Sequence, residues 1–130
     1  MRPPLFAALL IAASLVLAAG YPWGEVVGHT HWARVGWIPF VSGPIRRLDV
    51  AGNLLLCVPL GVVAGLSFKR GVLVAGGTAL ALSLFVETMQ LYTHSRFPSA
   101  TDVLCNVTGA VLAASFTRSY HRHVSRAGNS

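Results

Sequence analysis

Four long apolar stretches constrain this chain more than any other feature of its sequence. They cover residues 5–20, 48–68, 72–92 and 102–117, which is over half of the 130 residues. A helix needs about 20 mostly apolar residues to cross a membrane. A mean hydropathy of +0.62 is also too high for a soluble protein with one small core. The sequence therefore predicts an all-α integral membrane protein, a four-helix transmembrane bundle with an interfacial loop between the first two helices.

We expect one transmembrane domain, residues 1–117, followed by a basic, disordered cytoplasmic tail at 118–130. The first stretch has a second interpretation, because Arg2, a short apolar run and small residues at 18–20 are also typical of a cleaved signal peptide. A retained helix makes the number of spans even and places both termini on one side of the membrane. The retained helix is the interpretation followed here.

The lysines and arginines of the short loops predict the orientation of the helices. One side has Arg2, Lys69, Arg70, Arg118, Arg122 and Arg126, and the other has Arg34, Arg46, Arg47 and Arg96. The larger group favours a multi-pass protein of the cell membrane with cytoplasmic termini. Topology and contact with lipid headgroups then explain the net charge of +6, so no nucleic-acid partner is expected.

The loop at 21–47 contains all three tryptophans, Trp23, Trp32 and Trp37. Indole rings favour the headgroup level, so this loop is expected to lie along the outer membrane interface. His29 and His31 form an H-x-H in the same loop, but the spacing of the sequence supplies no further ligands. We expect neither a metal site nor a cofactor.

Polar residues fall near the outer ends of the last three predicted helices or in the connection between two of them. They are Asp49, Asn53, Glu87, Gln90, Arg96, Asp102 and Asn106. A carboxylate that faces hydrocarbon costs several kcal/mol, so such groups turn inward and pair. The sequence therefore predicts one polar pocket that opens to the outer face of the membrane.

Several of these residues also have purely structural interpretations. Asp49 is well placed to stabilise a helix N-terminus through the macrodipole. Asp102 fits a capping box with Ser99, and Gln90 and Asn106 fit hydrogen bonds between helices. Glu87 has no such alternative, because it lies inside an apolar helix well before the end of that helix.

Other residues of the spans are predicted to serve packing. Pro59 should bend the second helix, and Gly61 and Gly65 form a G-x-x-x-G that allows a neighbouring helix to approach closely. Cys57 and Cys105 are predicted to be small apolar core residues and not a disulfide.

Four ordered motifs give the chain a resemblance to a known family. They are WIPF at 37–40, NLLLCVPLG at 53–61, ETMQ at 87–90 and SRFPSATDVLCNVTGA at 95–110. Together they resemble the VanZ-like membrane proteins over residues 37–115. The resemblance carries over to Asn53, Pro59, Gly61, Glu87, Gln90, Arg96, Asp102, Asn106 and Gly109.

The resemblance implies a cell-envelope role in a bacterial cytoplasmic membrane, and the founding member is associated with resistance to the glycopeptide antibiotic teicoplanin. One departure from the family pattern matters for mechanism. Many members have two or three acids between the Arg and the Asn, where this chain has Ser99 and Thr101 and keeps Asp102 alone. This departure argues against a mechanism that uses paired carboxylates.

Three function hypotheses follow. The first is an enzyme that acts on an envelope lipid or lipid-linked glycan, with Glu87, Asp102 and Arg96 as the catalytic group. In that hypothesis the binding residues are Asp49, Asn53, Gln90 and Asn106. The second is an accessory protein that binds an amphiphile without chemistry, and in the third the polar cluster only locks the helices together. A homo-oligomer is also possible, with close-packing faces at Gly61, Gly65, Gly76 and Gly77.

Overall fold

The computed structural model describes Ala7, Ile11, Ser14, Leu15 and residues 26–42, 46–94 and 96–128. Its main helices are α2 (Arg47–Leu56), α3 (Val58–Ser67), α4 (Gly71–Gln90) and α5 (Ala100–Ala127). Three helical segments in this part of the chain are long and apolar enough to cross a membrane, namely Arg47–Ser67, Gly71–Gln90 and Ala100–Ala127. The prediction of an all-α, multi-pass membrane protein is confirmed at this level.

The predicted first helix, 5–20, lies mostly outside the described residues. Its four described positions have helical backbone, and Ile11 and Leu15 pack against the core of the bundle. The number of four spans therefore stays a prediction.

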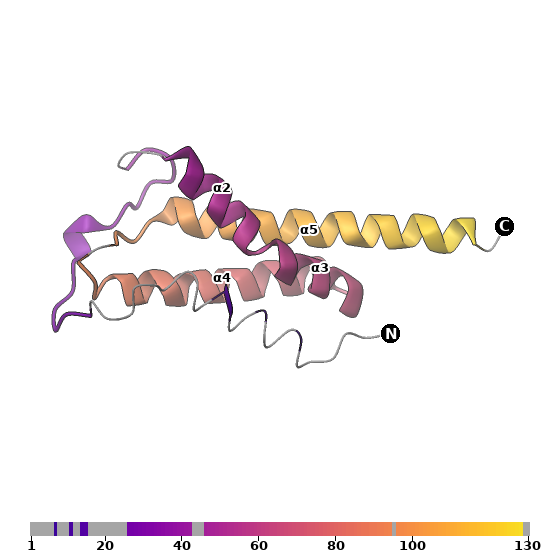
Figure 1. Cartoon of the computed structure of the whole chain (residues 1–130), viewed down its shortest axis with the longest axis horizontal. Coiled ribbons are helices and arrows are strands. Elements are labelled where there is room, and N and C mark those ends of the chain that lie inside the picture. The colour runs from indigo at the N-terminus through magenta and orange to yellow at the C-terminus, as the bar shows by residue number, and fades with distance from the viewer. Residues whose placement is uncertain are drawn as a thin grey trace.

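Helices α4 and α5 lie side by side and antiparallel, and the α2–α3 segment crosses them obliquely (Figure 1). The end of α4 and the start of α5 meet at one end of the bundle. The loop 26–42 and the connection 91–99 lie at the same end, which we call the loop end.

The second span is broken where the sequence predicts a bend. Helix α2 ends at Leu56, α3 begins at Val58, and Pro59 occupies the first turn of α3. A proline has no N–H to donate, and its ring clashes with the carbonyl group four residues earlier, so the helix is interrupted just before it. The first turn of a new helix is the position that tolerates proline.

Small residues bring the helices close together along α5. A side chain at Gly61 of α3 would collide with the carbonyl oxygen of Ala110, and one at Gly65 would lie 2.9 Å from the carbonyl oxygen of Ala114. The packing role predicted for this G-x-x-x-G is confirmed, with α5 of the same chain as the partner. Gly109 of α5 lies against the carbonyl group of Leu54 in α2 in the same way.

These contacts also bear on the expected oligomer faces. Gly61 and Gly65 are occupied by α5, and Gly76 faces the side chain of Val111 at 3.1 Å. Of the four glycines considered, Gly77 faces open space. Self-association remains a prediction, with less free glycine surface than the sequence suggests.

The core between the helices consists mainly of small side chains, while large apolar side chains point outward. The core cluster contains Cys57, Leu60, Ala64, Ala75, Ala79, Ala110 and Ala114. Leu48, Leu73 and Phe116 are exposed, as expected of side chains that face lipid. Cys57 and Cys105 are buried free thiols, which agrees with the prediction.

Helix α5 extends beyond its predicted end. The sequence predicts a helix at 102–117 and a disordered tail, but the helix continues to Ala127 and ends at Gly128. Hydropathy marks only the apolar part of a helix, and no glycine or proline interrupts the chain between 110 and 128. The Ser125 hydroxyl bonds back to the carbonyl of His121 within this polar extension.

The contact between α5 and α2 predicts a contrast between two glycines. Gly109→Ala should lower the free energy of unfolding by about 1 to 3 kcal/mol, because the new methyl group meets the Leu54 carbonyl. Gly77→Ala is the matched control and should be neutral or stabilising by up to about 1 kcal/mol, since Gly77 faces open space. Unfolding of both variants in mixed detergent micelles measures the difference, and equal effects would contradict the packing described.

Candidate functional site

The loop 26–42 is fastened to the connection that follows α4. Four backbone hydrogen bonds join the loop to this connection and to the first residue of α5, Ala100. They run from Val27 N–H to Tyr92 O (2.7 Å), His31 N–H to Leu91 O (3.0 Å), Gly36 N–H to Pro98 O (2.8 Å) and Ala100 N–H to Gly36 O (2.9 Å). A fifth bond runs from the Phe40 N–H to the Thr101 hydroxyl at 2.9 Å. The two segments therefore form one cover over the loop end of the bundle.

Exposed aromatic side chains lie on this cover. The rings of Trp32 and Trp37 stack with their centroids 6.3 Å apart, and both side chains are exposed. Ile38 and Val41 are exposed beside them in the sequence. An exposed apolar surface with indole rings fits the headgroup level of a membrane, as the sequence predicts for this loop. Trp23 lies outside the described residues.

The start of α5 explains what Glu87 does structurally. Ser99 is the N-cap of α5, and its hydroxyl accepts a hydrogen bond from the Thr101 N–H. In a capping box, Asp102 would accept the backbone N–H of Ser99. That N–H is instead donated to the Glu87 carboxylate at 2.6 Å. Glu87 therefore completes the cap of α5 from α4.

Because Glu87 accepts the Ser99 N–H, the Asp102 carboxylate is free for another partner. The Asn53 side chain of α2 interacts with the Asp102 carboxylate. Asp102 also interacts electrostatically with Glu87 and Arg96. Three helices and one connection therefore bring Asn53, Glu87, Arg96 and Asp102 together, and we call these four residues the polar cluster. The predicted pocket at the outer face and the catalytic and binding roles stay predictions.

The other predicted members lie around this cluster. Asp49 is exposed in the first turn of α2, where its charge stabilises the helix N-terminus and also acts on Asp102. Gln90 and Asn106 are buried between the helices, and Asn106 lies one turn after Asp102 on α5. The Asn106 Oδ1 atom accepts no hydrogen bond within the described part of the chain.

The polar cluster combines buried and accessible groups. Glu87 and Asp102 are half-buried, whereas Arg96 is exposed. One oxygen of Glu87 is fixed by Ser99, which holds the carboxylate in one position. A fixed carboxylate beside an exposed guanidinium is suited to bind a phosphate or carboxylate with the cation and to exchange a proton with the acid.

A second group of side chains, three histidines, lies on the cover. One of them, His94, is far from the other two in the sequence. His29 and His31 of the loop meet His94 of the connection, and ring nitrogens of the three lie within 4.8 Å of one another. Burial lowers the pKa of His31, and Arg34 and the two neighbouring histidines lower this pKa further. His94 belongs to no sequence motif, so only the folded structure shows that it lies close to His29 and His31.

Comparison with known proteins identifies the family of the chain. No curated protein and no solved structure matches the chain significantly. The sequence profile of the VanZ/LLP1 family matches residues 5–121, which extends beyond the four motifs on both sides. The matched region includes all four spans predicted from the sequence and every residue of the polar cluster. The chain belongs to the VanZ/LLP1 family of membrane proteins.

Proposed function

We propose that this VanZ/LLP1 protein binds or acts on a cell-envelope lipid or lipid-linked glycan at the polar cluster. The observation that carries the proposal is a half-buried carboxylate, Glu87, which lies in the last turn of the apolar helix α4 and interacts electrostatically with the exposed cation Arg96. An ionisable group at membrane depth is costly and is usually retained for function. In this proposal Arg96 binds a phosphate or carboxylate of the headgroup, and Glu87 donates or accepts a proton.

The surroundings of the cluster support an amphiphilic ligand. The exposed indoles Trp32 and Trp37 mark the headgroup level at the same end of the bundle. A headgroup at this level lies within reach of Arg96 while its acyl chains stay in the membrane.

A second candidate function rests on a specific contact. Glu87 caps α5 through Ser99, so the cluster has a structural task whether or not it performs chemistry. In this candidate the protein binds an amphiphile as an accessory factor, or the cluster only holds three helices in register. The two candidates differ in whether Glu87 must carry a proton.

Two substitutions of Glu87 separate the candidates. Glu87→Gln keeps an oxygen that accepts the Ser99 N–H but cannot carry a proton, whereas Glu87→Ala removes both properties. We expect Glu87→Ala to lower the free energy of unfolding by about 1 to 3 kcal/mol and Glu87→Gln to cost less than half of that. Unfolding in mixed micelles measures both variants.

The same two variants test the chemistry in cells. Lipid extracts and teicoplanin susceptibility are compared between cells with the wild-type gene, each variant and no gene. If the protein is an enzyme, cells with the wild-type gene should contain a modified lipid. Cells that make either variant in normal amounts should lack this lipid. Retention of the wild-type lipid profile and susceptibility in Glu87→Gln would remove Glu87 as a proton carrier and leave the accessory candidate.

The proposal also requires the loop end to face the outside of the cell, and thiol labelling tests this orientation. Ala33 of the loop and Ser119 of α5 are both exposed, and the native thiols Cys57 and Cys105 are buried. A membrane-impermeant maleimide should label Ala33→Cys in intact cells and Ser119→Cys only after permeabilisation. The reverse pattern would place the polar cluster at the cytoplasmic side and contradict the proposed orientation.

A further inference from the structure

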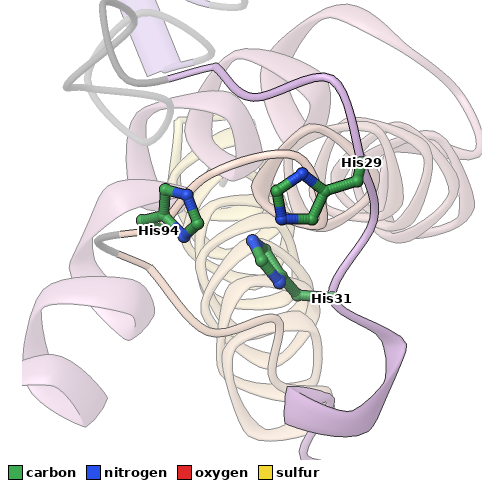
Figure 2. Close-up of side chains that lie close together, drawn as sticks. All are labelled: His29, His31 and His94. Atoms are coloured by element: carbon green, nitrogen blue, oxygen red, sulfur yellow. The ribbon is translucent and has the colours of Figure 1, made fainter.

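Three histidines from two separate segments form a compact group on the cover. His29 and His31 come from the loop that precedes α2, and His94 comes from the connection that follows α4. Figure 2 shows the three rings turned toward a common space, and the ring centroids are 4.7 to 5.6 Å apart. One potential ligand nitrogen from each ring lies within 4.8 Å of the other two.

We propose that His29, His31 and His94 bind one divalent transition-metal ion of the zinc type. Three imidazole nitrogens are a ligand set that suits Zn²⁺, and they leave one of four coordination positions open. His29 and His94 are exposed, so the open position faces solvent and is available to water or to an anionic oxygen. This site is separate from the polar cluster, and the inference does not rest on the proposed function.

One nitrogen in the group lacks a partner. The Nε2 atom of His31 is covered by the surrounding atoms and makes no hydrogen bond within the described part of the chain. A buried polar atom without a partner is disfavoured, and such atoms require an explanation. A metal ion bound at this nitrogen would satisfy it.

The backbone around the histidines is fixed before any metal binds. The His31 N–H donates to Leu91 O at 3.0 Å, and the Val27 N–H donates to Tyr92 O at 2.7 Å. These two bonds hold the loop against the connection just before His94. A site assembled on an already joined backbone needs little reorganisation to bind its ion.

The distances require only a modest movement of the side chains. Zn–N bonds of about 2.1 Å at tetrahedral angles place ligand nitrogens about 3.4 Å apart. The nitrogens here lie up to 4.8 Å apart, so the rings must close by roughly 1.4 Å. Rotation of the exposed rings of His29 and His94 supplies such a movement.

Two features of the histidine group act against the binding of a metal ion. The His29 ring contacts the rings of His31 and His94 edge to face, which is a favourable aromatic packing without any ion. Arg34 also lies near His31 and repels a cation. Arg34 is exposed, so solvent screens its charge, and its guanidinium lies over the Phe97 ring at 5.3 Å.

Metal binding is tested on the full-length protein, purified in mild detergent with an affinity tag that contains no histidine. Wild type equilibrated with Zn²⁺ and separated from free ion should retain about one zinc per chain by elemental analysis. His29→Ala, His31→Ala and His94→Ala should each weaken Zn²⁺ affinity by at least about 100-fold, because a lost ligand costs more than a lost outer-sphere partner.

The chain offers a matched control in its own C-terminal helix. His121 and His123 form a second H-x-H, but both are exposed on α5, where residues two apart do not share a face. The double variant His121→Ala/His123→Ala should bind Zn²⁺ like wild type. Loss of binding in this control, or undiminished binding in any of the three single variants, would overturn the assignment.

Two measurements on the wild type do not depend on how the variants fold. Co²⁺ bound in place of Zn²⁺ should give the visible absorption of tetrahedral coordination. Zn²⁺ should also raise the unfolding temperature, since a ligand that binds only the folded state stabilises it. Absence of both effects in the wild type would show that the three rings only stack.

Discussion

The hydrogen bond from the Ser99 N–H to the Glu87 carboxylate is the contact on which the loop end of the bundle depends. The first N–H groups of a helix have no partner inside the helix, and lipid offers none. In α5 these groups are satisfied from three sources. Ser99 donates to Glu87 of α4, Ala100 donates to Gly36 of the loop, and Thr101 donates to the Ser99 hydroxyl. The first N–H groups of α5 therefore join this helix to the end of α4 and to the loop.

Helix α5 plays a corresponding role along the length of the bundle. Gly109 meets α2, Ala110 and Ala114 meet the glycines of α3, and Val111 meets α4. In lipid, association of helices relies on close packing because apolar burial gives no net gain there. A core of alanines and glycines around one central helix is the expected solution. The same choice explains why the large apolar side chains, such as Leu73 and Phe116, are exposed.

The sequence alone predicts much of this architecture, because the signals involved are local. Apolar length places the spans within one or two residues at both ends of 48–68 and 72–92, and Pro59 locates the break between α2 and α3. The end of α5 is missed, because hydropathy carries no information about a helix that continues as a polar one. The convergence of Asn53, Glu87 and Asp102 is also predictable, since their depths in the membrane follow from helix rise.

Contacts made by irregular backbone lie outside what such signals reveal. The capping box of Ser99 and Asp102 is a valid local pattern, and the competition from Glu87 appears only when α4 and α5 are packed. The contact of His94 with His29 and His31 is likewise invisible to local patterns. It follows from the hydrogen bonds between the loop and Leu91 and Tyr92. Local patterns identify which residues are available, and the packed fold decides which of them become partners.

The two groups of functional interest are linked through one short segment. Glu87, His94, Arg96 and Ser99 lie within thirteen consecutive residues, from the end of α4 to the cap of α5. The connection therefore supplies His94 to one group, and Arg96 and the backbone N–H of Ser99 to the other. The loop contributes to the histidine group through His29 and His31 and to the α5 cap through Gly36, so the backbone contacts of one segment position residues of both groups.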